Sequence, residues 1–497
     1  MPDLPYAAPK LLSDLGLVAQ GGRNPHITGL CTDSRHAGQG VLFAALPGSA
    51  SHGAQYIGQV LGAGAAAVLT DAAGAAMAAQ ALVGSGAALI VLDDPREALA
   101  RAAALWFGAQ PAVMVAVTGT NGKTSVATFT RQIWAGLGQA AINIGTTGVE
   151  GAWAGPSSHT TPDPITLHRI LAEAAQAGVT HGAMEASSHG LDQRRMEGVT
   201  LRAAGFTNFT QDHLDYHKTF EAYFDAKAAL FTRLLPEGGV AVINMDDPRG
   251  ADMAGLARAR GQRVISVGRG EDCTLQIMGQ RFDAGGQDLR LAWEGRPYQV
   301  RLGLIGGFQA DNVALAAGLA IGAGAPVGEV MAALPALTGV RGRMQLAGRR
   351  GNGASVFVDY AHTPDAIATA LRALRPHVMG QIIIVMGAGG DRDRGKRPLM
   401  GAAAAEFADR VIVTDDNPRS EDPASIRAAI LAACPHAREI GDRAEAILHG
   451  VAGLGAGDAL LIAGKGHEAG QTIAGTVYPF DDVEQASLAI AALDGVI

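Results

Sequence analysis

The sequence predicts an α/β protein built on mostly parallel sheets. Continuous apolar runs such as Ala112–Val117 and Val240–Asn244 alternate with stretches of helical character, as expected of buried parallel strands and their connecting helices. The 67 glycines follow no fixed period and fall mostly at the ends of apolar runs, where tight strand–helix turns need them. At 497 residues the chain exceeds one ordinary core, so we expect about three domains.

We place the domain boundaries near residues 95 and 341, which gives an N-terminal domain (1–95), a central domain (96–341) and a C-terminal domain (342–497). In the central domain, apolar runs precede TGTNGKT, EASSHG, TNFTQDHLDYH and MDDP. Residues 274–302 then alternate apolar and polar side chains, which indicates a short antiparallel excursion. In the C-terminal domain, four apolar runs precede DYAHTPD, GAGGDRDRGKR, TDDNPR and AGKGHE. Since ligands bind beyond the carboxyl ends of strands in an open α/β sheet, we expect these four clusters to line one crevice.

Composition and charge restrict the classes of function. The chain has 48% hydrophobic and 17% charged residues, typical of a soluble globular protein, and its net charge of −8 argues against a general nucleic-acid surface. The cysteines Cys31, Cys273 and Cys434 form no CxxC pair, which predicts a reducing compartment and no cysteine metal site. The N-terminus lacks a basic segment followed by an apolar one, and no apolar stretch reaches the length of a membrane span. We therefore expect a cytoplasmic protein with no nucleic-acid or membrane partner.

The segment Gly119–Thr124 is predicted to cradle nucleotide phosphates. It follows an apolar run and opens a helical stretch, so its backbone amides and the helix N-terminus favour an anion. Lys123 would reach the outer phosphates and the Thr124 hydroxyl would hold magnesium. The chain has Val117 where the strict G-x-x-x-x-G-K-[ST] pattern requires glycine, so the loop is a shortened variant. The alternative is a glycine turn with an exposed lysine.

Two acidic clusters are candidates for a metal site. Glu185 ends an apolar run, and its carboxylate would share a magnesium ion with the phosphates; the alternative is a helix-capping cluster with Ser187, Ser188 and His189. The second cluster contains four possible metal ligands within six residues: Asp212, His213, Asp215 and His217. His213 and His217 would share a face if they were helical, and the alternative is a polar helix start.

For single charged residues elsewhere, the sequence pattern gives weaker evidence of a functional role. Lys227 lies in an apolar helical segment, where the residue pattern alone favours a lysine whose stem covers apolar surface while its amine reaches water. In the C-terminal clusters, Arg392 and Arg419 would each bind a carboxylate in a bidentate manner, and Asp416 and Glu468 would hold an ammonium group. Arginines at loop starts are commonly solvated, so these residues gain weight only as a group.

Taken together, these segments resemble the Mur ligases, and within that family the branch that adds meso-diaminopimelate. The residues that carry the resemblance run in family order through all three predicted domains: TGTNGKT (118–124), MEASSHGL (184–191), TNFTQDHLDYH (207–217), AKAALF (226–231), GRMQ (342–345), DYAHTPDA (359–366), GGDRDRGKRP (389–398), DNPR (416–419) and GKGHE (464–468). The resemblance implies a three-domain architecture with a central P-loop ATPase domain and a C-terminal Rossmann-like domain. It also implies a monomer that joins a carboxylate to an amine, with ATP and Mg²⁺ as cofactors and UDP-MurNAc-L-Ala-D-Glu and meso-diaminopimelate as substrates.

The resemblance assigns residues to each ligand. It implies ATP contacts at Gly119, Thr120, Asn121, Gly122, Lys123, Thr124, Ser125, Asn312 and Arg343, with Asp359 at the ribose. It implies contacts with the UDP-MurNAc-dipeptide at Thr32, Ser34, Ser49, Ala50, Ser51, His159, Thr160, Thr161, Ser187, Gln193 and Arg195. It implies diaminopimelate contacts at Arg392, Asp416, Asn417, Pro418, Arg419, Gly464 and Glu468. His159 stands where family members carry asparagine, which puts that one contact in doubt.

The resemblance also assigns the catalytic and metal positions. Lys227 matches a lysine that the family uses in carbamylated form, which replaces the solvent-facing interpretation, and Glu185 and His213 match metal-associated positions beside Thr124. The expected chemistry is phosphorylation of a carboxylate by ATP, followed by attack of an amine on the acyl phosphate. Closure of the C-terminal domain is expected to assemble the site.

Three other functions stay open. A sister ligase, such as a lysine-adding relative or folylpolyglutamate synthetase, shares GTNGKT, although TDSR and DNPR argue against both. A metal-dependent phosphohydrolase built on DHLDYH leaves the C-terminal arginines unexplained. A nucleotide sensor requires neither the arginine pair nor the acidic cluster.

Overall fold

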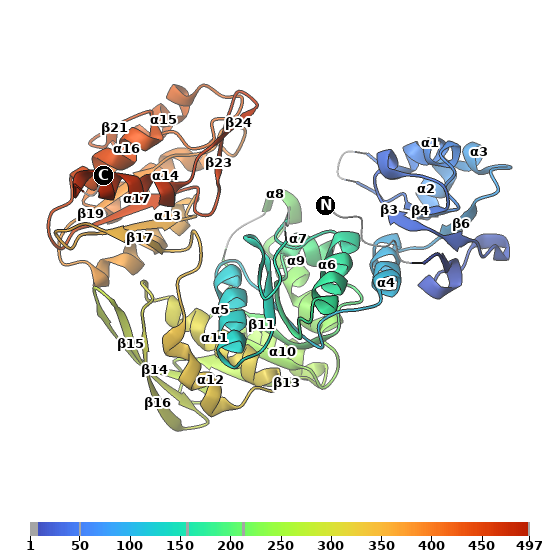
Figure 1. The fold of residues 1–497 in the computed structure, drawn as a ribbon, viewed down its shortest axis with the longest axis horizontal. Helices are drawn as coiled ribbons and strands as arrows, with labels where there is room; N and C mark the ends of the chain where they lie inside the picture. The colour runs from blue at the N-terminus through green and yellow to red at the C-terminus, as the bar shows by residue number, and fades with distance from the viewer. Residues whose placement is uncertain (1–7, 49–50, 156–158, 211–213, 496–497) are drawn as a thin grey trace. The chain divides into compact units, whose positions relative to one another are not determined.

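The computed structural model describes residues 8–48, 51–155, 159–210 and 214–495. The chain divides into two compact units: residues 1–267 with 315–326, and residues 268–314 with 327–497. The predicted division at 95 and 341 cuts the chain differently and stays a prediction. Each unit contains a parallel sheet, as predicted for an α/β protein (Figure 1).

The first unit begins with a small parallel sheet. Its strands, in spatial order, are β3 (Gly29–Cys31), β4 (Val41–Ala44), β5 (Ala67–Thr70) and β6 (Ala88–Val91). The helices of this part are α1 (Ile57–Gly62), α2 (Ala72–Met77), α3 (Ala79–Leu82) and α4 (Pro95–Phe107), and a short antiparallel pair precedes them, β1 (Lys10–Leu11) and β2 (His26–Ile27). Alternate residues of β4 enter two different apolar clusters, Leu42 with Leu99 and Trp106 of α4, and Phe43 with Ile57 of α1. The sheet is therefore buried on both faces, as continuous apolar strands require.

The larger sheet of the first unit carries the predicted phosphate loop. Its parallel strands are β13 (Arg263–Gly268), β12 (Val240–Asn244), β11 (Leu201–Phe206), β7 (Val113–Thr118), β10 (His181–Glu185) and β8 (Ala141–Gly145), with β9 (Gly148–Gly151) antiparallel at the edge. Its helices are α5 (Lys123–Gly136), α6 (Pro164–Gln176), α7 (Ser188–Asp192), α8 (Leu214–His217), α9 (Phe220–Ala229) and α10 (Gly250–Ala259). The predicted apolar runs all become strands here, and β12 has the predicted bounds. Because β11, β7 and β10 are neighbours, the loops that follow them meet at one edge.

The second unit holds a six-stranded sheet. Its spatial order is β17 (Gln345–Arg349), β18 (Ser355–Asp359), β22 (Ala459–Ala463), β19 (Ile382–Met386), β20 (Arg410–Val413) and β21 (Arg438–Glu439), and only β17 runs antiparallel to its neighbour. The four predicted polar clusters follow β18, β22, β19 and β20, which are adjacent parallel strands. The four clusters therefore lie along one edge of the sheet, and the expectation that they line one crevice stays a prediction.

Helices cover both faces of this six-stranded sheet. They are α13 (Pro364–Leu374), α14 (Lys396–Phe407), α15 (Pro423–Leu431), α16 (Arg443–Ala452) and α17 (Asp482–Leu493). Along β19, Ile384 enters the cluster that contains Leu371 and Ile426, whereas Val385 enters the cluster that contains Ile447 and Ala486. The period of two along the strand therefore places α13 and α15 on one face and α16 and α17 on the other.

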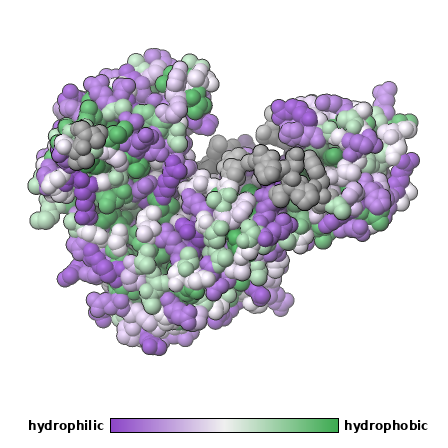
Figure 2. All heavy atoms as spheres, viewed as in Figure 1, coloured by the Kyte–Doolittle hydropathy of each residue, from purple (hydrophilic) through white to green (hydrophobic). Residues whose placement is uncertain are grey.

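The remaining elements of the second unit are hairpins and connecting helices. The strands β14 (Leu275–Asp283), β15 (Gly286–Trp293) and β16 (Arg296–Leu302) form the predicted antiparallel excursion. The helices are α11 (Gln309–Gly322), whose residues are divided between the two units, and α12 (Val327–Ala333). The last hairpin consists of β23 (Gly470–Ile473) and β24 (Thr476–Pro479). On the face shown in Figure 2, hydrophilic and hydrophobic residues are interspersed. None of the helices within the described ranges combines the length and apolarity needed to cross a bilayer.

Local sequence determines where several helices begin. An Asp-Pro or Thr-Pro step opens α4, α6, α13 and α15, and in each case the Asp or Thr side chain accepts a hydrogen bond from a backbone amide of the first turn. Proline at the first helical position lacks only an amide that the helix would leave unpaired. Three of these four helices start directly after the loops that hold predicted site residues, so the caps also fix where those loops end.

A buried ion pair joins α16 to α17. Arg443 Nε and Nη2 each donate to an Asp482 carboxylate oxygen at 2.7 Å, and both side chains are fully buried. Arg443 Nη2 also donates to the Ala463 carbonyl at the end of β22. The pair therefore anchors both helices beneath the strand that leads into the AGKGHE cluster.

We expect Asp482→Ala to lower the free energy of unfolding by about 3–5 kcal/mol, because it leaves the Arg443 guanidinium buried without its counter-charge. Urea unfolding measures the change. The neighbouring Asp481→Asn variant is the control, since asparagine caps a helix as well as aspartate does and Asp481 caps α17. Equal stability of the two variants would contradict a structural role for the pair.

Candidate active site

The predicted phosphate loop joins β7 to α5 and depends on two glycines. Gly119 has φ 145° and Gly122 has φ 86°, and α5 begins at Lys123. A Cβ atom on Gly119 would lie 1.8 Å from Thr207 Oγ1 and 3.0 Å from the Asn208 amide nitrogen, so no other residue fits there without displacing the next loop. The loop, the strand and the helix occur in the predicted order, which supports a phosphate-binding turn.

The loop is hydrogen-bonded to the segment that follows β11. The Thr120 amide donates to the Asn208 carbonyl at 2.9 Å, and the Asn121 amide donates to Asn208 Oδ1 at 2.8 Å. Thr207 Oγ1 donates to the Asn121 carbonyl at 2.6 Å. Sequence reasoning did not identify Thr207 and Asn208 as loop supports, although the adjacency of two parallel strands would have pointed to them.

Two lysine ammonium groups meet at one carbonyl oxygen of the loop. Lys123 Nζ donates to the Gly119 carbonyl at 2.9 Å and to the Thr120 carbonyl at 2.8 Å, while Lys227 Nζ donates to the Gly119 carbonyl at 2.8 Å. Lys227 is only 1% exposed, and its Nζ lies 4.3 Å from the centroid of the Tyr223 ring. The alternative in which the Lys227 amine reaches water is therefore wrong. The alternative of an exposed Lys123 is also wrong, since this side chain folds back over its own loop.

Glu185 lies at the end of β10, directly beside β7. One carboxylate oxygen accepts the Thr146 amide at 2.7 Å and the other accepts the Thr146 hydroxyl at 3.2 Å. A Cβ atom on Gly145 would lie 2.0 Å from Glu185 Oε1, so glycine leaves room for the carboxylate. The capping alternative applies instead to Ser187, whose Oγ accepts the Gly190 amide at the start of α7. Glu185 is thus a buried carboxylate at the same sheet edge as the phosphate loop.

The residues predicted to contact the peptide substrate form one hydrogen-bond network with Glu185. Thr161 Oγ1 donates to the Glu185 carbonyl at 2.9 Å and lies 3.0 Å from Ser187 Oγ. Arg195 donates to the Thr161 carbonyl at 2.7 Å and to Gln193 Oε1 at 2.8 Å.

Thr160 enters the same network through Thr146, since their hydroxyl oxygens lie 3.0 Å apart. Thr146 was missed by sequence reasoning, because its polar side chain follows a different strand, β8. His159 is exposed beside this network. Burial lowers the pKa of the Arg195 guanidinium, which stays a cation and keeps a site for an anion here.

The second acidic cluster is described only in part. Asp212 and His213 lie outside the described residues, as does the side chain of Asp215. His217 is buried, and its ring packs 4.8 Å from Tyr216 and 5.2 Å from Tyr223, centroid to centroid. Within the part of the chain that the structure describes, no group of three His, Cys, Asp or Glu side chains is arranged to hold a metal ion.

The residues predicted to hold the uridine nucleotide follow adjacent strands of the small sheet. Thr32 and Ser34 follow β3, and Ser51 follows β4. Ser49 and Ala50 lie outside the described residues. Beside Ser51, His52 Nδ1 accepts the Ala54 amide at 3.0 Å, so its Nε2 carries the proton and donates to Asp71 at 3.1 Å. This pair fixes the end of the loop that carries Ser51.

Four of the residues predicted to bind the amino acid form an acidic cluster in the second unit. Asn417 Nδ2 donates to Asp416 Oδ1 at 3.0 Å and to Glu468 Oε2 at 2.9 Å. Gly464 has φ 117°, and a Cβ atom there would lie 2.4 Å from Asp416 Oδ2. The buried Lys465 ammonium lies 3.6 Å from Glu468, a partner that sequence reasoning missed. The cluster presents carboxylates at one sheet edge, as an ammonium substrate requires.

Arg419 has a strained backbone that its neighbours hold in place. Its φ of 53° is left-handed, which costs a non-glycine residue on the order of 1–3 kcal/mol. The Arg419 amide donates to the Thr472 carbonyl and the Ala474 amide donates to the Arg419 carbonyl, so β23 pairs with this residue. Arg419 Nη1 donates to the Gly390 carbonyl at 2.7 Å, next to the loop that carries exposed Arg392. The loops that carry the two arginines are therefore in direct contact.

Of the three nucleotide contacts predicted in the second unit, two lie together. Asp359 accepts the Met344 amide at 2.6 Å and the Ala361 amide at 2.8 Å, and Met344 directly follows Arg343. The Arg343 guanidinium lies 4.6 Å from the Tyr360 ring centroid. Burial raises the pKa of Asp359, partly offset by the Arg343 charge. Asn312 lies on α11, where its amide donates to Gln309.

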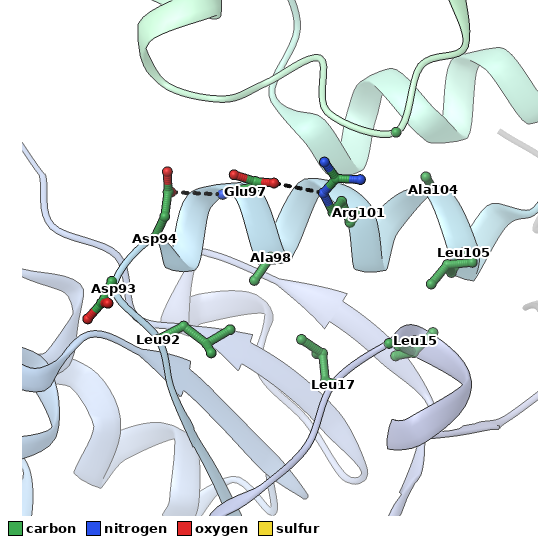
Figure 3. A pocket seen from close by; sticks show the side chains of 12 residues that line it. Leu15, Leu17, Leu92, Asp93, Asp94, Glu97, Ala98, Arg101, Ala104 and Leu105 are labelled. Atoms are coloured by element: carbon green, nitrogen blue, oxygen red, sulfur yellow. Dashed lines mark hydrogen bonds and ion pairs between the residues drawn. The ribbon is translucent and has the colours of Figure 1, made fainter. Parts of the chain in front are cut away.

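A separate pocket lies apart from all these residues. Figure 3 shows it beneath α4, where Asp94 accepts the Glu97 amide and Glu97 pairs with Arg101. The pocket has a volume of about 580 Å³ and is lined by Leu15, Gly16, Leu17, Leu92, Asp93, Asp94, Glu97, Ala98, Arg101, Ala104, Leu105 and Gly198. None of its lining residues was predicted to bind a substrate, so cavity size alone does not locate the chemistry.

Most of the chain matches known protein domains. Residues 117–320 match the Mur ligase middle domain, residues 342–466 match the Mur ligase glutamate ligase domain, and residues 26–107 match the Mur ligase family catalytic domain. The chain belongs to the Mur ligase family.

Relatives and solved structures agree with this membership. The chain is 52% identical over 494 residues to the UDP-N-acetylmuramoyl-L-alanyl-D-glutamate--2,6-diaminopimelate ligase of Caulobacter vibrioides, covering 98% of this chain and 99% of the relative. It is 52% identical to the ligase of the same name from Bradyrhizobium diazoefficiens, covering 94% and 95%. A solved structure of a UDP-N-acetylmuramoyl-L-alanyl-D-glutamate--2,6-diaminopimelate ligase matches with a TM-score of 0.72 at 34% identity, covering 98% and 99%. MurF from Acinetobacter baumannii matches in fold alone, with a TM-score of 0.63 at 19% identity over 92% of this chain and 96% of MurF.

The AGKGHE cluster contains a histidine, His467, whose surroundings disfavour its charged form. Burial, with the charges of Arg343 and Arg341, lowers the pKa of His467 to about 4. Between pH 6.5 and about 4 the unfolded chain therefore binds a proton that the folded chain does not, so stability falls as the pH falls through this window.

The free energy of unfolding is expected to fall between pH 7 and pH 4. We expect His467→Gln to reduce this fall by roughly 3 kcal/mol at most, because glutamine does not titrate. Urea unfolding at several pH values measures it, with exposed His436→Gln as the control. An unchanged slope in His467→Gln would show that this ring titrates normally.

Proposed function

We propose that this chain is an ATP-dependent ligase that adds meso-diaminopimelate to the D-glutamate γ-carboxylate of UDP-MurNAc-L-Ala-D-Glu. ATP becomes ADP and phosphate, and the product serves cytoplasmic peptidoglycan synthesis. The observation that carries the proposal is the convergence of Lys123 and Lys227 on the Gly119 carbonyl, in a chain about half identical to ligases with this name over nearly its whole length. The three domains at 1–95, 96–341 and 342–497, and a monomeric state, belong to the same proposal.

The reaction has to overcome a poor leaving group, since direct attack of an amine on a carboxylate would expel oxide. In the first step a γ-carboxylate oxygen attacks the γ-phosphorus of ATP, and ADP leaves with the electrons of the broken P–O bond. In the second step the amine nitrogen attacks the acyl carbon, the C–O bond to phosphate breaks, and the nitrogen loses a proton. Both steps concentrate negative charge, so the main tasks of the protein are positioning and charge neutralisation.

The lysine arrangement suits the first step. The Lys123 ammonium already lies over the loop whose amides would bind the phosphates, so a short movement from the Gly119 and Thr120 carbonyls brings it to a phosphate oxygen. Beside it, the network of Glu185, Thr161 and Arg195 would hold the peptide carboxylate, with Arg195 as the cation. The buried surroundings strengthen each of these interactions relative to water.

Magnesium fits the donor chemistry at this edge. The Thr124 hydroxyl in the first turn of α5 and the Glu185 carboxylate at the end of β10 are oxygen donors, which Mg²⁺ prefers. His213 and a carbamate on Lys227 complete the proposed ligand set. The carbamate would form in two steps: the Lys227 ammonium loses one proton, and the neutral amine nitrogen then adds to CO₂ and releases a second proton, which leaves an anionic carbamate as an oxygen ligand. When bound, the ion would neutralise charge on the transferring phosphoryl group.

The second unit supplies the amine. Asp416 and Glu468 would hold the ammonium end of diaminopimelate, and Arg419 would bind the carboxylate at its far end, which lysine lacks. Folylpolyglutamate synthetases share the fold, with a TM-score of 0.61 at 19% identity for the Mycobacterium tuberculosis protein. The amine that the chain accepts therefore separates this proposal from a sister ligase.

We expect phosphate release from ATP in the presence of UDP-MurNAc-L-Ala-D-Glu to require meso-diaminopimelate, with lysine at least about 100-fold poorer in kcat/KM because Arg419 would lose its carboxylate partner. A coupled phosphate assay measures both rates, and Lys123→Ala serves as the inactive control. Equal use of the two amines would refute the specificity. Phosphate release without any amine would favour the phosphohydrolase.

We expect Lys227→Ala to lose at least about 100-fold in kcat, because a charged group at the phosphate loop disappears. Added short carboxylic acids should restore part of the activity by occupying the vacated space, while leaving the unaltered enzyme unstimulated. The same phosphate assay measures both effects. A fully active variant would contradict any catalytic role for Lys227.

A further inference from the structure

The two loops that carry Arg392 and Arg419 are interlocked by their backbones. They follow the neighbouring parallel strands β19 and β20. The Gly390 amide donates to the Asn417 carbonyl at 2.9 Å, and Arg419 Nη1 returns a bond to the Gly390 carbonyl at 2.7 Å. A Cβ atom on Gly390 would lie 1.9 Å from the Pro418 carbonyl oxygen, so the loops approach as closely as backbone permits. Neither loop can shift without moving the other.

The residues next to the two arginines bind each other directly. Asp391 precedes Arg392, and Ser420 follows Arg419. Ser420 Oγ donates to Asp391 Oδ1 at 2.6 Å, and the Ser420 amide donates to Asp391 Oδ2 at 3.1 Å. Asp391 and Arg419 both have φ 53°, so each loop turns through a non-glycine left-handed residue at the point of contact. Such residues persist only where their surroundings hold them, and they concentrate at functional sites.

Glu421 ties the interlocked loops to α14. Its carboxylate accepts the Asp391 amide at 2.6 Å and both terminal nitrogens of buried Arg397, at 2.8 Å and 3.1 Å. Arg394 adds a second ion pair at 3.1 Å. The carboxylate is largely buried, and the Arg397 hydrogen bonds hold the pKa of Glu421 at about 2, so it is ionised at neutral pH. One carboxylate therefore fixes the Asp391 turn against a rigid helix.

We propose that Asp391, Ser420 and Glu421 are positioning residues that set the spacing and angle of Arg392 and Arg419, and thereby select an amine substrate that carries a carboxylate at each end. This inference rests on the proposed function. An arginine grips a carboxylate through a planar fork, so a small rotation of its backbone loses one of the two hydrogen bonds. Loops that are held before the substrate arrives also avoid the entropy cost of ordering them on binding.

We call the contacts of Asp391, Ser420 and Glu421 the lock. Three variants test the lock without removing an arginine. Ser420→Ala deletes one hydroxyl donor, and Ser420→Thr restores it. Asp391→Gly keeps the left-handed turn but deletes both carboxylate contacts, so it separates the lock from backbone strain. Asp422→Asn is the matched control, because Asp422 caps α15 directly after Glu421 and asparagine caps equally well. The full-length enzyme is assayed for phosphate release with each substrate varied in turn.

We expect the KM for meso-diaminopimelate to rise about 5-fold in Ser420→Ala and at least about 10-fold in Asp391→Gly, from the loss of one and two hydrogen bonds. The KM values for ATP and UDP-MurNAc-L-Ala-D-Glu and the saturated kcat should stay within about 2-fold of the unaltered enzyme, and Ser420→Thr and Asp422→Asn should behave like it. The preference for meso-diaminopimelate over lysine should shrink in parallel.

The outcomes separate this inference from the function on which it rests. If the unaltered enzyme uses meso-diaminopimelate but Asp391→Gly keeps its KM and its preference, the lock is refuted and the proposed function stands. A uniform loss in kcat for all substrates would also refute the lock, because it would indicate general damage. If the unaltered enzyme releases no phosphate on addition of meso-diaminopimelate, the proposed function itself fails.

Discussion

The Gly119 carbonyl oxygen is the point on which the rest of the candidate site depends. It accepts hydrogen bonds from the side-chain nitrogens of Lys123, in the first turn of the helix α5 that follows the loop, and of Lys227 on α9, more than 100 residues later in the chain. A carbonyl can accept both because it has two lone pairs, and it can turn toward both because glycine permits φ 145°. The side-chain nitrogens of two lysines thus lie beside the loop. Their position follows from one backbone conformation.

The parallel strand order brings the other residues of the candidate sites together. The phosphate loop, Asn208 and Glu185 follow β7, β11 and β10, three neighbouring strands whose carboxyl ends share an edge. In the second unit, Asp359, Arg392, Asp416 and Gly464 follow four adjacent strands in the same way. Each cluster brings together residues that are distant in sequence, because the sheet aligns strand ends and short loops cannot carry their side chains far away. Both edges carry charges of both signs: Lys123 and Glu185 lie at the first, and Asp416, Glu468 and Lys465 at the second.

The sequence predicted the strands well and the contacts less well. Val240–Asn244 was predicted with the observed bounds, because buried parallel strands are continuous apolar runs bounded by polar residues. The candidate residues around Glu185 and Asp416 were also found, mostly through the family resemblance. The residue pattern around Lys227 predicted a solvent-facing amine, which is wrong. An apolar helical segment does not show that the amine donates to a carbonyl that is distant in sequence. Thr146, Asn208 and Lys465 were missed for the same reason, because each acts through a partner set only by tertiary packing.

The strand order of the second sheet has a consequence for biosynthesis. β22 is the last strand of this sheet to be made, yet it lies between β18 and β19, which precede it by about 100 and 75 residues. Until the ribosome has released residues 459–463, β18 and β19 have no shared neighbour, and the face between them stays open. Pairing across such sequence separations is slow and comes late in folding. Gly464 and Glu468 emerge directly behind this strand, so a nascent or truncated chain would acquire its nucleotide loop well before it could hold an amino acid.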